Sequence, residues 1–135
     1  MRMKLDASRG RVNHRDMILF DELYDEEKYF GGIRSFDGVN YDDFRELLSS
    51  NLIDPEDAQN YAPTAGEIGE FLREHPNFTA HGYAVSPMRD DYRISFEGVS
   101  CELEYSKEDM LDFVNLFRLA DEFTIEPGSL YCWFD

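Results

Sequence analysis

The clearest hydrophobic pattern of the chain lies in its second half, where apolar and polar residues alternate. Residues 78–85 alternate as one β-strand does, and residues 92–96 alternate in the same way after a turn at 87–90. Residues 99–103 continue the alternation with the opposite phase. A two-residue hairpin turn at Glu97-Gly98 explains the change of phase and sets Phe96 opposite Val99. We therefore predict a three-stranded antiparallel meander.

Apolar residues at helical spacing follow three capping signals. Each predicted helix begins with a cap residue and an acidic residue three positions later: Asn40 and Asp43, Thr64 and Glu67, and Ser106 and Asp109. The second of these helices is predicted to end at His75-Pro76, because the residue before proline is pushed out of helical geometry. Asp54-Pro55 predicts the start of one more short helix.

The two ends of the chain differ in how clearly they predict structure. Residues 1–14 are polar and basic, and we expect a poorly ordered lead-in there. Residues 17–20 form a short apolar run that indicates a buried strand, and residues 33–36 predict a second one. At the other end, strands over 123–126 and 130–134 flank Pro127-Gly128, which suits a type II turn and pairs Ile125 with Leu130.

Together these elements predict a single α+β domain over residues 15–135. Its sheet is expected to be mainly antiparallel, a three-stranded meander plus the C-terminal hairpin, with the helices packed on one face. Parallel pairing between the meander and the hairpin stays open, because a helix joins them.

The net charge of −16 limits the kinds of molecule that can bind the protein. Such a field repels nucleic acid and anionic membranes and attracts basic protein surfaces. No run of residues is apolar enough for a membrane span or for a secretion signal, and the chain carries two cysteines, so we expect a cytoplasmic protein. Cys101 and Cys132 are expected to be reduced and buried. The competing explanation of the charge is adaptation to a saline cell.

Two sets of residues are candidates for contact with a partner. The densest acidic run contains Asp21, Glu22, Asp25, Glu26 and Glu27, with Tyr24 and Tyr29 as candidate anchors. The second set is Tyr131 and Trp133, which alternate with core-facing residues in the last strand. We expect these residues to form the partner-binding surface.

The candidates for chemistry are few. His81 shares a predicted strand face with Tyr83, and the two are the residues around which a polar pocket is expected if one exists. His75 is expected to play a structural role at the end of its helix. No metal-binding, phosphate-binding or nucleophile motif occurs, so no metal and no cofactor is expected.

The function that this sequence favours is a non-enzymatic acidic protein-binding domain. Two forms are an inhibitor that mimics the charge of nucleic acid and an immunity protein or antitoxin that neutralises a basic partner. The alternatives are a small enzyme or ligand-binding domain around His81 and Tyr83, and a housekeeping domain made acidic by salt adaptation. The oligomeric state does not follow from the sequence.

Overall fold

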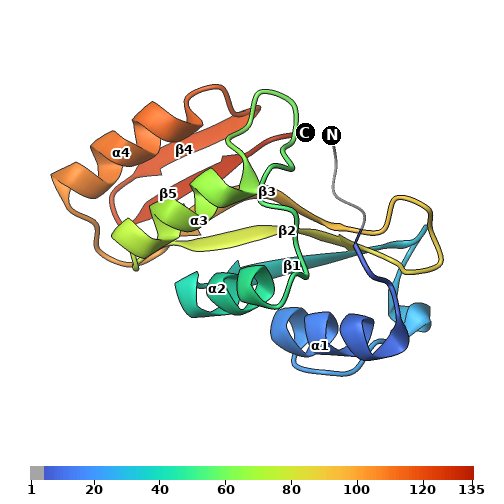
Figure 1. Ribbon diagram of the computed structural model, residues 1–135. Helices are drawn as coiled ribbons and strands as arrows, with labels where there is room; N and C mark the ends of the chain where they lie inside the picture. The colour runs from blue at the N-terminus through green and yellow to red at the C-terminus, as the bar shows by residue number, and fades with distance from the viewer. Residues whose placement is uncertain (1–4) are drawn as a thin grey trace.

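A computed structural model describes residues 5–135, which form one five-stranded antiparallel sheet, four α-helices and a short 3-10 helix (Figure 1). In chain order these are α1 Arg9–Phe20, the 3-10 helix Glu26–Lys28, β1 Ile33–Val39, α2 Tyr41–Ser49, α3 Ala65–Glu74, β2 Thr79–Val85, β3 Ile94–Cys101, α4 Lys107–Phe117, β4 Glu122–Glu126 and β5 Ser129–Trp133. The α+β class is confirmed. Within residues 5–135, no helix combines the length and the apolar character that crossing a bilayer requires.

The order of strands in the sheet is β1-β2-β3-β5-β4, and every pair is antiparallel. The C-terminal hairpin has the predicted register, with Ile125 opposite Leu130 and Phe123 opposite Cys132. It joins the rest of the sheet through β5, which pairs with β3 at Ser100 and Cys101. The parallel pairing that the sequence left open does not occur.

The predicted hairpin at Glu97-Gly98 is wrong. Residues 94–101 form one continuous strand, and its pairing with β2 shifts by one residue, from His81 opposite Gly98 to Gly82 opposite Phe96. Glu97 is therefore the extra residue of a β-bulge. A bulge reverses the alternation of side chains just as a turn does, and hydrophobic phase alone does not tell the two apart.

The helix starts are confirmed at all three capping signals. The side chains of Asn40, Thr64 and Ser106 each accept a hydrogen bond from the backbone N–H three residues later, and the acidic side chain there accepts one in return. α3 ends before His75-Pro76 as expected. The short helix predicted at Asp54-Pro55 does not form. The Asp54 carboxylate accepts the Glu56 N–H in a turn, and the chain does not continue from this turn into a helix.

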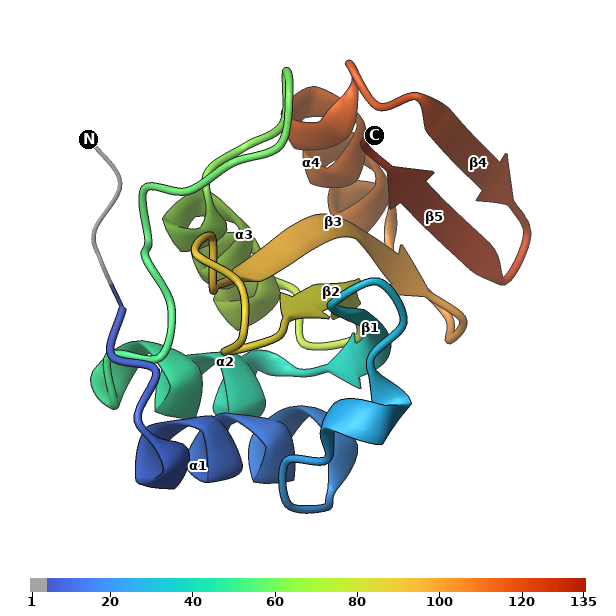
Figure 2. The same ribbon diagram turned by 90° about the vertical axis from the view of Figure 1, so that its right-hand side faces the viewer.

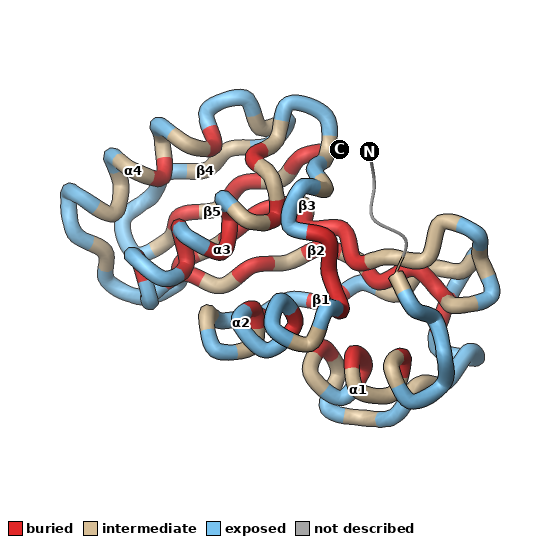
Figure 3. Tube along the Cα trace, viewed as in Figure 1, coloured by how far each residue is buried: buried red, intermediate tan, exposed pale blue. Residues whose placement is uncertain are grey.

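The core lies between the sheet and the helices. Phe44 of α2 contacts Phe96 of β3 with ring centroids 5.5 Å apart, and Phe113 of α4 stacks on Phe123 of β4 at 4.9 Å. The helices lie on one side of the twisted sheet (Figure 2). Buried residues run through the central strands and the inner turns of the helices, and exposed residues follow the outer turns and loops (Figure 3).

The N-terminal region departs most from the sequence prediction. Residues 9–14, expected within a poorly ordered lead-in, begin α1, and the strand predicted over 17–20 is the end of the same helix. Residues 1–4 of that lead-in lie outside the described part of the chain. The apolar run 17–20 was predicted as a strand because α1 has only a weak apolar face and so shows little helical periodicity. Its buried residues include a charged pair, Arg15 and Asp16.

That charged pair anchors α1 to the sheet. Arg15 Nε donates to Asp16 Oδ1 at 2.9 Å, and Arg15 also donates to the Val85 carbonyl at 2.9 Å and to the Tyr29 hydroxyl at 2.7 Å. The Tyr29 hydroxyl donates in turn to Asp16 Oδ2 at 2.7 Å. The Arg15 guanidinium lies 4.7 Å from the Tyr92 ring centroid. Every charged atom of this buried network therefore has a partner, as burial requires.

Candidate functional site

Within residues 5–135, a groove of about 570 Å³ lies between α3 and α4. Its lining includes four carboxylates, which are Glu67, Glu70, Glu74 and Asp112, and an apolar floor of Phe71 and Leu116. Among the described residues that line it, none is a lysine or an arginine. Arg73 of α3 has an exposed guanidinium that pairs with Glu70 at 2.8 Å and with Glu74 at 3.7 Å. The groove is thus a negatively charged cleft with an apolar base.

His75 lies at one end of this groove, directly after the last residue of α3. Its side chain is 5% exposed and packs on Phe71, with ring centroids 4.6 Å apart, and at the edge of Phe78. Nδ1 lies 2.6 Å from Asp109 Oδ1, and Nε2 lies 2.9 Å from Asp112 Oδ2. The imidazole is therefore held between two carboxylates from α4. His75 was expected to play a structural role at the end of its own helix, and its ring points across to the other helix.

The carboxylate on the buried side of the ring is held ionised. Burial by itself would raise the pKa of Asp109, but the hydrogen bonds from Ser106 and from His75 outweigh it, and the pKa lies below its ordinary value. Asp109 has two roles, because it contacts His75 and also closes the capping box of α4. Its position is therefore set by the start of the helix.

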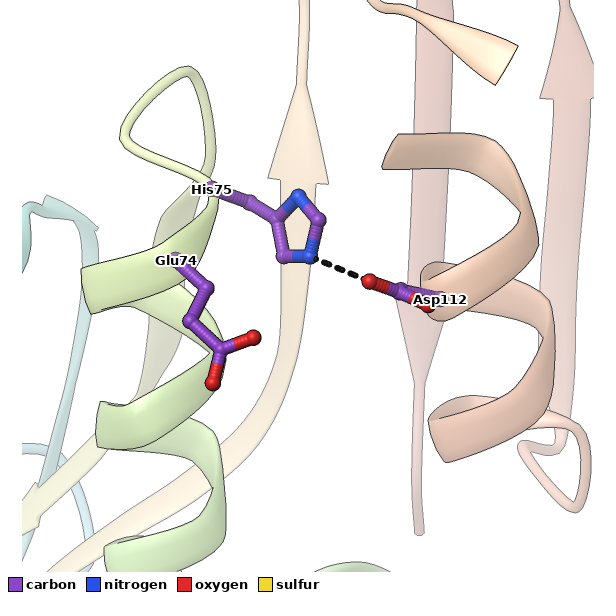
Figure 4. Close-up of side chains that lie close together, drawn as sticks. All are labelled: Glu74, His75 and Asp112. Carbon is purple, nitrogen blue, oxygen red and sulfur yellow. Dashed lines mark hydrogen bonds and ion pairs between the residues drawn. The ribbon is translucent and has the colours of Figure 1, made fainter. Parts of the chain in front are cut away.

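Glu74 completes a cluster with His75 and Asp112 at this end of the groove. One ligand atom from each of Glu74, His75 and Asp112 can be chosen so that all three lie within 4.8 Å of one another. Figure 4 shows Glu74 and His75 at the end of α3, with Asp112 reaching from α4 toward the imidazole. An imidazole with two carboxylates is a donor set that can hold a divalent metal ion.

The acidic run proposed for partner contact is partly occupied by the protein itself. Glu22 pairs with Lys28 at 2.8 Å and with Arg34 at 2.8 Å. Glu26 accepts hydrogen bonds from the Tyr24 hydroxyl and the Ser86 hydroxyl, which join this segment to the end of β2. These carboxylates are therefore less available to a partner than their number in the sequence suggests.

The remaining residues of that run have different surroundings. Asp25 caps the 3-10 helix by accepting the Glu27 N–H, and Asp21 ends α1 in the left-handed region with a φ of 58°. Asp21 and Glu27 are exposed. Tyr29 is 6% exposed and belongs to the buried network of Arg15, so it is not available as a surface anchor. That part of the sequence expectation does not fit the structure.

The other predicted site residues come together on the face of the sheet away from the helices. His81 of β2 stacks on Tyr131 of β5 with ring centroids 5.1 Å apart, and Trp133 Nε1 donates to Glu97 Oε2 at 3.1 Å. The Tyr83 hydroxyl accepts a hydrogen bond from Arg93 at 2.9 Å. Each of these aromatic side chains is half-buried. The structure thus joins two candidate sets that the sequence kept apart.

His81 is poorly suited to proton transfer in this position. Burial lowers its pKa, against the opposing effect of the hydrogen bond to the Cys132 carbonyl. Because a carbonyl only accepts, Nε2 carries the proton of a neutral ring in that 3.0 Å contact. Burial also raises the pKa of the neighbouring Glu97. His81 and Glu97 are therefore better suited to packing in an aromatic surface than to acting as an acid–base pair.

The two cysteines are free and buried, as predicted. Burial raises the pKa of Cys132 to about 12 and raises that of Cys101 as well, so both thiols stay protonated at neutral pH. Neither is placed as a reactive nucleophile.

Sequence reasoning did not find the groove or the cluster at its end. His75 is separated by 34 residues from Asp109 and by 37 from Asp112, and no ligand-spacing motif spans such distances. The one available signal was the pair Asp109 and Asp112, three residues apart on a predicted helix. It indicates two carboxylates on one helix face and names no partner.

No protein-family model matches the chain, no curated protein matches it, and no solved structure matches it. Its function therefore has to be inferred from its own residues.

Proposed function

We propose that this protein is a non-enzymatic acidic protein-binding domain and that a basic partner docks in the groove between α3 and α4. The observation that carries the proposal is the single sign of charge in that groove. Four carboxylates line it around an apolar floor, and no lysine or arginine is among the described residues of that lining. A segment that presents lysine or arginine beside apolar side chains complements both features.

The proposed occupant is a cationic amphipathic segment of the partner. Its apolar residues would pack on Phe71 and Leu116, and its cations would meet Glu67 and Glu70 at the rim. Two antiparallel or crossing helices with a groove between them commonly accept a third helix in this way. The field of a chain with net charge −16 would speed the encounter and make it depend on salt.

Two biological forms fit this chemistry, an inhibitor that occupies the nucleic-acid site of a basic enzyme and an immunity protein or antitoxin. Both require a partner surface rich in lysine and arginine. The groove takes the place of the acidic run 21–27 as the main contact, because its lining combines four carboxylates with the apolar side chains of Phe71 and Leu116.

The test uses a fluorescein-labelled amphipathic peptide rich in Lys and Leu, of about four helical turns. Its dissociation constant is measured by anisotropy in chelator-containing buffer at low and high salt. The groove variant is Glu67→Gln with Glu70→Gln, which keeps the capping box because glutamine serves at that position too. The matched control is Asp21→Asn with Glu27→Gln, which removes the same charge from two exposed residues.

We expect the groove variant to weaken peptide binding about tenfold, since two exposed ion pairs contribute about 1 kcal/mol each at most. The control is expected to weaken it by less than about twofold, and native binding should fall steeply with salt. Equal losses in both variants would mean that only the overall field attracts the peptide. The groove proposal would then fail, and salt adaptation would be the better explanation of the charge.

A second arm uses the native partner. A basic protein recovered from host lysate by the native chain at low salt should be retained by the control variant and lost by the groove variant. Retention by both would again remove the groove from the interface.

A further inference from the structure

We propose that Glu74, His75 and Asp112 bind one divalent transition-metal ion, and that Asp109 orients the imidazole for it. The ligand atoms of the three residues lie within 4.8 Å of one another at the end of the α3–α4 groove. This inference does not depend on the protein-binding proposal, because it concerns a site that the chain forms by itself.

The donor set selects the class of ion. One imidazole nitrogen and two carboxylate oxygens suit Zn²⁺ and its neighbours in the first transition series. Ca²⁺ takes six to eight oxygen ligands, and Mg²⁺ is usually held by carboxylates and water. A nitrogen donor among only three protein ligands therefore favours a transition metal.

The imidazole is positioned as metal-binding histidines are. In such sites, the nitrogen that does not bind the ion usually donates its proton to a carboxylate, which sets the tautomer and the direction of the ring. Here Nδ1 lies 2.6 Å from Asp109 Oδ1, and the packing on Phe71 and Phe78 holds the ring in place. A bound ion would take the place of the proton through which Nε2 contacts Asp112 Oδ2, while Nδ1 remains the donor to Asp109, and the lone pair of Nε2 would then point at the ion.

The distances leave room for an ion after a small movement of the carboxylates. Ligand atoms at about 2.0–2.2 Å from a tetrahedral zinc ion lie roughly 3.3–3.6 Å from each other. Nε2 of His75 and Oδ2 of Asp112 are now 2.9 Å apart, so an ion between them would replace this direct contact. Glu74 is 57% exposed, and its one ion pair among residues 5–135 is a 3.7 Å surface contact with Arg73, which allows the side chain to move inward.

The groove gives the ion a path and leaves part of its coordination shell open. The cluster shares Glu74, His75 and Asp112 with the lining of the groove, through which a cation can reach it. A tetrahedral ion with three protein ligands keeps one position for water or for a ligand in the groove. The site would thus join the end of α3 to α4 and remain accessible.

The competing role of His75 is purely structural. An imidazole between two carboxylates joins two helices without any ion, and a metal chelator or added zinc would then change nothing. The two roles differ in whether Glu74 matters, because Glu74 is a ligand in the metal site and makes no contact with His75 among the hydrogen bonds and ion pairs of the described residues.

The experiment is isothermal titration of the chelator-treated full chain with ZnCl₂, with CoCl₂ as a spectroscopic probe and CaCl₂ as a control ion. The variants are Glu74→Gln and Asp112→Asn, and the matched control is Glu70→Gln, which lies in the same groove and loses the same charge. Circular dichroism establishes that each variant is folded. Glu74 and Asp112 are exposed or half-exposed, so neither variant removes a core side chain.

We expect one Zn²⁺ per native chain, a visible absorption from bound Co²⁺, and a rise in Tm with added zinc. Glu74→Gln and Asp112→Asn should each weaken zinc binding by tenfold or more, and Glu70→Gln by less than about twofold. The absence of stoichiometric zinc binding would overturn the proposal, as would equal losses in Glu74→Gln and Glu70→Gln or a preference for Ca²⁺. Such a failure would leave the peptide result standing, because that test uses chelated protein and residues outside the ligand set.

Discussion

Asp112 Oδ2 lies 2.9 Å from Nε2 of His75, so residues 37 positions apart in the sequence join the end of α3 to the middle of α4. The other ring nitrogen meets Asp109 at 2.6 Å. Asp112 is half-exposed, whereas the imidazole is buried. The contact therefore links a buried core residue to the acidic groove that we propose as the binding surface.

Replacing His75 by phenylalanine should destabilise the metal-free protein by about 2 kcal/mol. The aromatic ring would keep its packing, but both hydrogen bonds would be lost, and Asp109 and Asp112 would be left close together without the imidazole between them. The control is His14→Phe, because His14 is 42% exposed and lies 3.8 Å from Glu46, a pair expected to contribute less than about 1 kcal/mol. Urea unfolding of both variants measures the difference, and equal losses would contradict a structural role for the His75 contacts.

The bulge at Glu97 depends on two glycines. A Cβ at Gly82 would lie 1.9 Å from the Ser95 carbonyl oxygen, and one at Gly98 would lie 2.0 Å from the Cys132 carbonyl oxygen. Both obstacles are backbone atoms of neighbouring strands, so Gly82→Ala and Gly98→Ala should each cost about 3 kcal/mol. Gly10→Ala is the control. Its Cβ would meet nothing within 4 Å, and alanine in a helix should add roughly 0.5–1 kcal/mol of stability. Thermal or urea unfolding that finds the strand variants as stable as the native chain would contradict the bulge.

Single substitutions in the buried network of α1 should lower the free energy of unfolding by several kcal/mol. Asp16→Asn leaves Arg15 buried without an opposite charge, which should cost about 3–5 kcal/mol. Tyr29→Phe removes one hydroxyl that bonds to both members of the pair, and should cost about 1–3 kcal/mol. Glu70→Gln, which removes an exposed pair with Arg73, serves as the reference at about 1 kcal/mol or less. Similar losses in Asp16→Asn and Glu70→Gln would show that the network does not hold α1 on the sheet.

His81 predicts a component of stability that depends on pH. Burial lowers its pKa in the folded state, and in the unfolded chain it titrates near its ordinary value of about 6.5. The unfolded state therefore binds the proton first as pH falls, and this part of the stability is present above about pH 6.5 and is lost as pH decreases toward the folded-state pKa. His81→Gln should lack this loss. The measurement is the free energy of unfolding of both proteins across this pH window, and parallel curves would exclude the effect.

The candidate site illustrates what a sequence pattern can and cannot predict. The net charge and the capping residues Glu67 and Asp109 were visible in the sequence, and both contribute to the site. The groove itself was not visible, because it exists only where α3 and α4 pack side by side. His81 and Tyr131 were identified in separate hypotheses, and only the pairing of strands in one sheet brings their rings to 5.1 Å.

The sequence by itself determined the elements whose signals are local. Side chains three residues apart cap α2, α3 and α4, and Pro127-Gly128 sets the last hairpin, because these contacts form within a few residues. The tertiary structure alone decided the helical state of residues 17–20, whose charged neighbours Arg15 and Asp16 need, besides each other, partners on the sheet and on Tyr29. It also decided between turn and bulge at Glu97, since both reverse the alternation and only the neighbouring strands β2 and β5 select one. The contacts between His75 and α4 were likewise decided by the tertiary structure, because they join segments that are far apart in the sequence and meet only when the chain folds.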